Sequence, residues 1–556
     1  MIRHLLSLFV CSLFLLVGTI SHGQERPTTP PKLVLFITVD QLRGDFPTRY
    51  LARFEEGGFR YLIENGTYYT NAHYKHACTE TAVGHATLAT GAYPSRHGII
   101  GNDWVDPSTG TFVYNTEDER HHIIGQEPVA HQGVSPRNLL SSTIGDELVV
   151  SNAHQSRVFS VSGKDRGAIL PGGRAGKAFW YSKSTGDFVT STYYYTDYPQ
   201  WVKEWNAAKP ADQYKGKTWE LLNDRSTYIA GEIDDRPYEV NFPPLGRTFP
   251  HSLGDNEHFY LILAFTPIGD TLTLDFTKTL IENENLGQGP ATDLLAVSFS
   301  STDSIGHFFG TSSLENEDNL LRLNRTLAEL FDFVDKKVGL DHTLIILSSD
   351  HGGAEAPEYM ETLGFETGRV NLDFFKKKGP LREALNQRYG RDDLIAAHNH
   401  PYLYLNANAM DTAGLNIEAV EQFIAAEVVK TPGIAFAQTR SDLLAGRVVE
   451  SLLSRQIRRN FHPQRSGNVY IVQDQYWFLH STDAAKKLGV ESIGSVHGSP
   501  WTYDTYVPIF FAGHQVPKQT VDRRVAPSDI APTIARYLGI KFPSGSTGNP
   551  LTEVLK

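Results

Sequence analysis

Four short apolar runs of the chain each lead into charged residues or histidine. They are Leu33–Val39 before Asp40, Val158–Val161 before Lys164 and Arg166, Leu294–Phe299 before Asp303, and Thr343–Leu347 before Asp350 and His351. Apolar runs without alternation are typical of strands that are buried on both faces of a parallel sheet. The polar residues then lie at the carboxyl ends of the strands, where open parallel sheets bind their ligands.

A helical pattern separates the last two of these runs. Ser312 and Glu315 have the spacing of a capping box, and apolar residues then repeat at helical spacing at Leu320, Leu323, Leu327, Leu330 and Val334. Val507–Phe511 predicts a further strand, and Ser528–Leu538 predicts a helix that Gly539 ends. The order of these elements predicts an α/β fold whose mainly parallel central sheet is flanked by helices.

Two long segments interrupt this pattern. The first, about 167–290, is rich in aromatic and turn-forming residues, and the second, about 353–490, contains a predicted helix at Ile417–Val429. We interpret both as insertions that form a smaller cap on one core. The chain from 24 to 556 is therefore predicted to be one catalytic domain.

The amino terminus has the layout of a secretory signal peptide. Arg3 precedes the uncharged apolar run Leu5–Ile20, and Ser21–Gly23 ends in a small residue. An uncleaved anchor is the alternative, although the run is shorter than a span of about 20 residues. We predict a signal peptide at 1–23 and no stable membrane anchoring after its cleavage.

Composition narrows the class of protein further. The 556 residues are 40% hydrophobic, which allows a large core, and the formal charge of −12 with mixed signs disfavours a nucleic-acid partner. Cys11 lies in the predicted signal peptide, so Cys78 is left without a partner for an internal disulfide. An exported protein that folds without disulfides is typical of a bacterial periplasmic enzyme.

Three carboxylates and three imidazoles have positions that suit a metal site: Asp40, Asp303, His307, Asp350, His351 and His497. One aspartate at a strand end is most often a cap or turn former, but several in register with histidines favour metal binding. Oxygen and nitrogen ligands without thiolate suit catalytic zinc, although manganese or iron accept a similar set. Six ligands divide naturally between two metals.

A candidate nucleophile, Thr81, lies at a predicted helix start. Thr81 is either an N-cap or a hydroxyl that the positive helix end and a metal activate, and periodicity alone favours the N-cap. We interpret His85, His398 and His400 as structural.

Two basic residues could bind an anion. Lys164 and Arg166 alternate around Asp165, so both could face one side and offer a point charge and a forked donor to phosphate oxygens. An exposed basic turn is the alternative.

In their order along the chain, these residues resemble the alkaline phosphatase superfamily, and more narrowly its monomeric bacterial phosphatases of the phosphate-irrepressible type with a threonine nucleophile. The motifs that carry the resemblance are Val39-Asp40-Gln41, Thr81-Ala82-Val83-Gly84-His85, Thr90-Gly91-Ala92-Tyr93-Pro94, Gly101-Asn102, Gly163-Lys164-Asp165-Arg166, Asp303 with His307, Asp350-His351-Gly352, and His497-Gly498-Ser499-Pro500.

The resemblance implies a two-zinc phosphatase that acts through a phosphothreonine. One zinc is expected on Asp303, His307 and His497, and the other on Asp40, Thr81, Asp350 and His351. Asn102, Lys164 and Arg166 are expected to bind the phosphoryl oxygens. The resemblance also implies a monomer, no required magnesium and a broad range of small phosphate monoesters as substrates.

Two other functions stay open. A phosphodiesterase or nucleotide pyrophosphatase of the same superfamily would use the same metals, but that branch lacks the Lys-x-Arg pair seen at Lys164 and Arg166. An inactive phosphate-ester-binding protein is the non-enzyme alternative, which the complete ligand set disfavours. Sulfatases share the fold, but their nucleophile is a Cys or Ser followed by x-Pro-x-Arg. Thr81 departs from that pattern.

Overall fold

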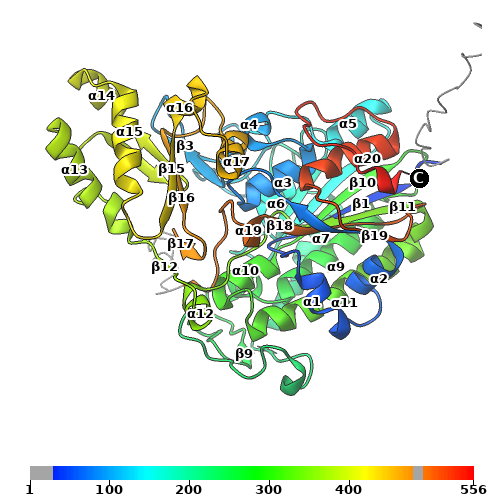
Figure 1. Cartoon of the computed structure of the whole chain (residues 1–556). Coiled ribbons are helices and arrows are strands. Elements are labelled where there is room, and N and C mark those ends of the chain that lie inside the picture. The colour runs from blue at the N-terminus through cyan, green and yellow to red at the C-terminus, as the bar shows by residue number, and fades with distance from the viewer. Residues whose placement is uncertain (1–28, 480–492, 556) are drawn as a thin grey trace, which may run out of the picture.

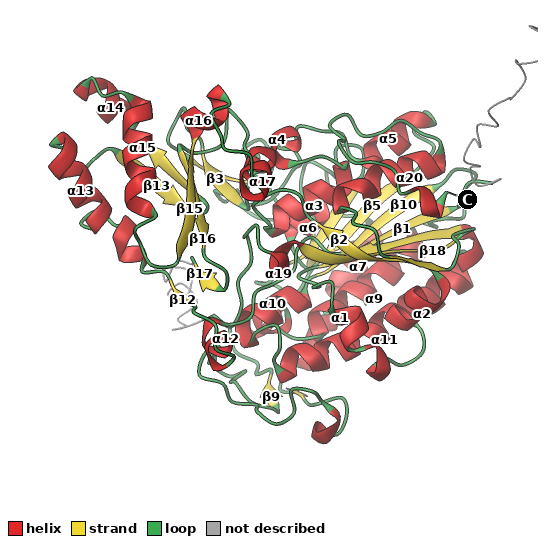
Figure 2. Ribbon diagram, in the orientation of Figure 1, coloured by secondary structure: helices red, strands yellow, loops and turns green. Residues whose placement is uncertain are grey.

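The computed structural model of the protein describes residues 29–479 and 493–555, so the predicted signal peptide lies outside the described residues. A nine-stranded sheet forms the centre, with strand order β19-β2-β18-β11-β1-β10-β5-β6-β7 (Figures 1 and 2). Its strands are β1 (Leu33–Val39), β2 (Thr67–His73), β5 (Val158–Ser162), β6 (Lys177–Tyr181), β7 (Phe188–Val189), β10 (Asp293–Phe299), β11 (Thr343–Ser348), β18 (Tyr506–Gly513) and β19 (Gln519–Val521).

The middle of this sheet is parallel. Strands β11, β1, β10, β5 and β6 pair in parallel, whereas β18 runs antiparallel to both β11 and β2. Every residue of β1, β5, β10 and β11 is buried, as the uninterrupted apolar runs predict for strands covered on both faces. The predicted α/β fold with a mainly parallel sheet is confirmed.

Helices cover the two faces of the sheet. Leu35 and Ile37 of β1 pack into one core with the helices α2 (Gly58–Asn65), α9 (Ile268–Asn283) and α11 (Leu314–Lys337). The neighbours Val34 and Phe36 point the other way and pack with α5 (Ile144–Ser151) and α20 (Ile530–Leu538). Alternate residues of one strand therefore stabilise two separate layers.

Two predicted helix ends can be compared with the structure. The N-cap of α11 is Ser313 and not the predicted Ser312. The Ser313 hydroxyl accepts a hydrogen bond from the backbone nitrogen of Asn316 at 3.0 Å. Ser312 instead donates to Glu355. Helix α20 ends at Gly539, as predicted, in the left-handed conformation with φ of 72°.

A second, four-stranded sheet lies to the left in Figure 1 and belongs to the predicted insertion at about 353–490. Its strands are β13 (Ile395–Asn399), β14 (Tyr402–Leu405), β15 (Ile434–Thr439) and β16 (Val469–Gln473), and it packs with α13 (Pro380–Tyr389), α14 (Ala407–Ala413) and α15 (Ile417–Val428). The predicted helix at Ile417–Val429 is therefore confirmed as α15. This sheet has a hydrophobic core of its own.

The predicted insertion at about 167–290 differs from the structure. Strands β6 and β7 extend the central sheet, and Phe179 of β6 packs on Phe276 of α9 with ring centroids 5.5 Å apart. These aromatic residues belong to the main core because β6 continues the sheet beside β5.

The other helices and strands of the described residues have the following bounds. The helices are α1 (Phe46–Arg49), α3 (Thr81–Thr90), α4 (Pro94–His97), α6 (Asp165–Gly172), α7 (Gln200–Ala207), α8 (Phe259–Leu263), α10 (Ser301–Phe309), α12 (Pro357–Thr362), α16 (Arg440–Ala445), α17 (Leu452–Asn460) and α19 (Thr502–Thr505). The strands are β3 (Asp103–Val105), β4 (Phe112–Tyr114), β8 (Thr218–Trp219), β9 (His251–Ser252), β12 (Gly368–Arg369) and β17 (Trp477–Phe478). Within 29–479 and 493–555, no helix is both long and apolar enough to cross a membrane.

Candidate active site

The predicted site residues meet at the carboxyl end of the central sheet. Asp40 follows β1, Lys164 follows β5, and Asp350 follows β11. Helix α10 begins directly after β10 and carries Asp303 and, one turn later, His307. Parallel strands thus bring together residues from distant parts of the sequence, as the strand-end pattern predicts.

Carboxylates and imidazoles face one another closely in this cluster. His351 Nε2 lies 3.3 Å from Asp40 Oδ1 and 3.5 Å from Asp350 Oδ2. His307 Nε2 and His497 Nε2 lie 3.2 Å and 3.4 Å from Asp303 Oδ1. Asp40, Asp350 and His351 form one compact group of ligand atoms, and Asp303, His351 and His497 form another. His351 belongs to both groups, so the predicted division of ligands between two ions stays a prediction.

Backbone carbonyls orient the three histidines. The Nδ1 atoms of His307, His351 and His497 lie 2.8, 2.8 and 2.9 Å from the carbonyl oxygens of Ser495, Gly352 and Thr79. An Nδ1 proton donated to a carbonyl leaves Nε2 with a free lone pair that faces the cluster. This tautomer and ring orientation are those of histidine ligands in metal sites.

Buried oxygens in the cluster fit a bound cation. Both carboxylate oxygens of Asp40 and Oδ2 of Asp350 are buried and accept no well-aligned hydrogen bond from the described residues, although the Lys164 ammonium lies beside Asp40 Oδ2. Lys164 compensates one negative charge, and burying the remaining carboxylate charge is costly unless a further cation compensates it. Together with the nitrogen donors nearby, these oxygens offer the mixed ligand set that zinc accepts.

Lys164 holds the carboxylates in their ionised form. Its ammonium lies 2.6 Å from Asp40 Oδ2 and also pairs with Asp303. Burial acts to raise the pKa of Asp40, but the positive charge of Lys164, with the His351 ring nearby, outweighs burial and lowers that pKa. Burial is likewise outweighed at Asp303, where His307 and Lys164 lower the pKa well below its usual range. Both side chains are thus anionic.

Thr81 directs its hydroxyl at this cluster and does not cap its helix. Thr81 is the first residue of α3, and the N-cap position is occupied by Glu80. The fully buried Thr81 hydroxyl lies 3.4 Å from His351 Nε2 and 3.5 Å from Arg166 Nη2. The N-cap alternative is therefore wrong.

Two residues of α3 support the site in ways that the sequence did not reveal. A Cβ atom on Gly84 would lie 2.0 Å from the carbonyl oxygen of Asp350, so only glycine allows α3 this close to the end of β11. His85 Nδ1 lies 2.9 Å from the Thr81 carbonyl and 3.2 Å from Asp350 Oδ2. His85 therefore orients Asp350, which goes beyond the purely structural role predicted for it.

Gln41 is a second supporting residue without a predicted role. Its side-chain nitrogen donates to Asp303 Oδ1 at 2.9 Å, and its backbone nitrogen donates to Asp350 Oδ1 at 3.2 Å. The residue has a φ of 63°, a left-handed conformation that is unusual for a residue with a side chain. Gln41 thus connects the two groups of ligands.

The predicted phosphate-binding residues surround Thr81. Asn102 Oδ1 accepts a hydrogen bond from the backbone nitrogen of Ala82 at 3.0 Å, and the side-chain nitrogen of Asn102 donates to none of the described residues. Lys164 is buried, so the alternative of an exposed basic turn is wrong for it. Burial opposes the charge of Arg166, but nearby Tyr114 and Asp165 raise its pKa, so the guanidinium stays charged.

Comparison with known proteins places the chain in a family. Residues 34–500 match the family described as type I phosphodiesterase / nucleotide pyrophosphatase. The chain therefore belongs to that family, which lies within the alkaline phosphatase superfamily. It is 36% identical to a protein of Myroides odoratus named calcium-transporting ATPase, with 98% of each chain covered. It is 35% identical to alkaline phosphatase PafA of Elizabethkingia meningoseptica, over 97% of this chain and 98% of the relative.

A crystal structure of alkaline phosphatase PafA has the same fold. The two structures superpose with a TM-score of 0.87 at 33% identity, over 95% of this chain and 99% of the other. A second PafA structure carries a variant in which a threonine is changed to serine and an asparagine, a lysine and an arginine are changed to alanine. These four residue types recur at the same intervals here, as Thr81, Asn102, Lys164 and Arg166.

Proposed function

We propose that the protein is a zinc-dependent phosphatase that releases inorganic phosphate from small phosphate monoesters, with Thr81 as its nucleophile. The position of the Thr81 hydroxyl carries this proposal, because it lies between His351 of the candidate metal cluster and the Arg166 guanidinium. Similarity to alkaline phosphatase PafA supports the same activity. The proposal includes export to a bacterial periplasm, a monomeric state and a broad range of substrates.

The donor atoms allow two zinc ions. Asp303, His307 and His497 would hold one ion, and Asp40, Thr81, Asp350 and His351 would hold the other. Zinc bound there would supply positive charge that lowers the pKa of a coordinated hydroxyl or water and stabilises charge in the transition state. The buried, ionised carboxylates of Asp40 and Asp303 support such a site.

Hydrolysis would take place in two displacements at phosphorus. The Thr81 oxygen bonds to phosphorus as the bond to the leaving oxygen breaks, which gives phosphothreonine and an alcohol. A water molecule then attacks the same phosphorus and breaks its bond to the Thr81 oxygen. Inorganic phosphate leaves, and a proton returns to Thr81. The helix start at α3 favours this chemistry because the positive end of a helix stabilises negative charge on the threonine oxygen.

Three side chains would hold the remaining phosphoryl oxygens. Arg166 offers a planar fork, Lys164 a point charge, and Asn102 an amide that has no other acceptor among the described residues. A monoester dianion carries more charge on these oxygens than a diester does, so two cations favour the monoester. Phosphodiesterase activity is the second candidate, and the description of the family supports it.

Removing the two basic side chains, Lys164 and Arg166, distinguishes a monoesterase from a phosphodiesterase. Changing Lys164 and Arg166 together to alanine is expected to lower kcat/KM for an aryl phosphate monoester by about 10²- to 10³-fold, because the transition-state oxygens lose their charged partners. We expect less than a tenfold loss for the matching diester. Steady-state kinetics on zinc-loaded protein, with bound zinc measured in each variant, makes the comparison.

The control is Lys203→Ala, which removes an exposed lysine that pairs with Asp197 on the surface. This variant is expected to leave kcat/KM for both substrates unchanged. An equal loss on monoester and diester in the double variant would contradict the assigned role of Lys164 and Arg166.

A further inference from the structure

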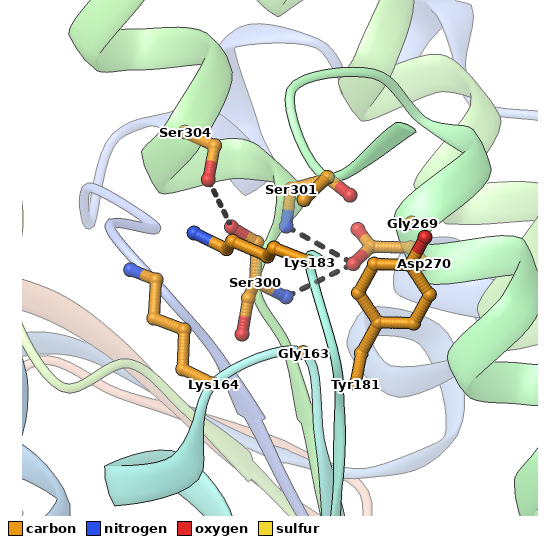
Figure 3. Close-up of a pocket in the computed structure, with 10 residues that line it drawn as sticks. Gly163, Lys164, Tyr181, Lys183, Gly269, Asp270, Ser300, Ser301 and Ser304 are labelled. Atoms are coloured by element: carbon orange, nitrogen blue, oxygen red, sulfur yellow. Dashed lines mark hydrogen bonds between the residues drawn. The ribbon is translucent and has the colours of Figure 1, made fainter. Parts of the chain in front are cut away.

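Asp270 is a buried carboxylate that caps a helix other than its own. It lies in the first turn of α9, and its Oδ1 atom accepts hydrogen bonds from the backbone nitrogens of Ser300 and Ser301 at 2.9 and 3.0 Å. Ser300 is the N-cap residue of α10, but its own side chain makes no capping hydrogen bond. Figure 3 shows the two bonds to Asp270 as dashed lines. Asp270 therefore fixes the point at which α10 begins.

The surroundings of Asp270 indicate more than a stabilising contact. A Cβ atom on Gly269 would lie 2.8 Å from the Ser301 hydroxyl oxygen, so the start of α9 lies close against the start of α10. The second carboxylate oxygen, Asp270 Oδ2, is buried and has no well-aligned hydrogen-bond donor among the described residues. A buried oxygen without a donor costs stability. This cost favours a positioning role for Asp270 over a purely stabilising one.

Helix α10 positions all three proposed ligands of one zinc ion. Asp303 and His307 lie on the helix itself. The backbone carbonyl of His307 accepts a hydrogen bond from the backbone nitrogen of Gly494 at 2.8 Å, and His307 Nδ1 lies 2.8 Å from the carbonyl oxygen of Ser495. Ser495 stands two residues before His497 in the sequence. The placement of α10 therefore also affects the turn that carries His497.

The proposed ligands of the other zinc ion come from different elements. Asp40 follows β1, Asp350 and His351 follow β11, and Thr81 begins α3. Strands β1 and β11 pair directly with each other in the central sheet. A displacement of α10 would therefore disturb the ion on Asp303 more than the ion on Asp40.

We propose that Asp270 is a positioning residue for the zinc ion on Asp303, His307 and His497, so that loss of Asp270 weakens the binding of that ion selectively. The proposal rests on the two-zinc site of the proposed function. It adds to that site a carboxylate that acts through the backbone of α10 and not as a ligand. Groups that orient metal ligands typically change metal affinity about 10- to 100-fold when they are removed.

Zinc titration of the mature chain in competition with a chromophoric chelator measures the two affinities without turnover. Asp270→Ala removes the acceptor of two backbone hydrogen bonds at the start of α10. It is expected to weaken the binding of one zinc ion about 10- to 100-fold and to leave the other affinity unchanged. His307→Ala and Asp350→Ala, which each remove a proposed ligand of a different ion, identify the affected ion. We expect Asp270→Ala to match His307→Ala.

Two further variants of Asp270 separate positioning from stability. Asp270→Asn keeps an oxygen that can accept both backbone hydrogen bonds, so it is expected to retain both zinc affinities. Asp270→Glu keeps the charge but moves the carboxylate by one methylene group, so it is expected to weaken the same ion as Asp270→Ala. The glutamate variant also provides the result if the alanine variant does not fold.

The matched control is Asp293→Ala. Asp293 is a buried carboxylate at the start of β10, where it accepts hydrogen bonds from the backbone nitrogens of Arg157 and Gly287 at 2.8 and 3.0 Å. Its loss is expected to lower the Tm and to leave both zinc affinities unchanged, because β10 carries the proposed ligands at its other end.

The titration also distinguishes failure of this inference from failure of the proposed function. Unchanged zinc affinities in both Asp270→Ala and Asp270→Glu, or equal weakening of both ions, would overturn the positioning role while the proposed function stands. Wild-type protein that binds two zinc ions but hydrolyses no phosphate monoester would contradict the monoesterase function alone. Wild-type protein that binds fewer than two zinc ions would overturn both.

Discussion

Replacing Thr81 with alanine is expected to lower kcat for an aryl phosphate monoester by at least about 10⁴-fold. The hydroxyl is fully buried and lies within 3.5 Å of His351 and Arg166, so its loss removes the oxygen that bonds to phosphorus. Thr81→Ser keeps a hydroxyl and is expected to keep most of the activity. Steady-state and single-turnover kinetics make the measurement.

The control for Thr81→Ala lies on the same helix. Thr87 is buried in α3, but its hydroxyl contacts His97 and not the metal cluster. Thr87→Ala is therefore expected to lose stability and retain turnover. Zinc content is measured in both variants, because Thr81 is also a proposed ligand. Turnover of Thr81→Ala within a hundredfold of wild type, with zinc bound, would show that another group attacks phosphorus.

Removal of the metal ions is expected to lower monoester turnover to a similar extent, by about 10⁴-fold or more, and to destabilise the fold. Asp40 and Asp350 would keep buried carboxylate charge that Lys164 compensates only in part, and the apoprotein would lose the binding energy of two ions. A ligand present at about a thousand times its Kd stabilises a protein by about 4 kcal/mol. Thermal unfolding with and without a chelator measures this change.

Return of zinc defines the second half of this test. Activity is expected to recover fully as two zinc ions bind per chain, with no need for magnesium. Full activity after complete removal of metal would contradict the proposed site. Recovery that requires added magnesium after zinc loading would contradict the proposed ligand set.

The buried strands were the most predictable part of the fold. β1, β5, β10 and β11 are buried at every position because helices cover both faces, and that burial favours the mainly apolar runs seen in the sequence. The sequence did not predict β6. It begins at Lys177, and its aromatic residues stand among turn-forming segments, so its pattern did not distinguish a core strand from a small subdomain.

The site also has a part that the sequence predicts and a part that it does not predict. Asp40, Asp303 and Asp350 could be predicted to meet because strand ends converge on one edge of a parallel sheet. The roles of Gln41 and His85 depend on contacts between residues far apart in the sequence, such as Gln41 with Asp303 and His85 with Asp350. The close approach of α3 to the end of β11 creates the second contact, and the helical spacing of residues in the sequence does not predict that approach.

The most direct test of the proposed function compares an aryl phosphate monoester with the matching aryl phosphate diester on the zinc-loaded mature chain. We expect kcat/KM to favour the monoester strongly, because Lys164 and Arg166 compensate the extra charge on its phosphoryl oxygens. Preferential hydrolysis of the diester would contradict a monoesterase and would identify the protein as a phosphodiesterase that uses the same Thr81.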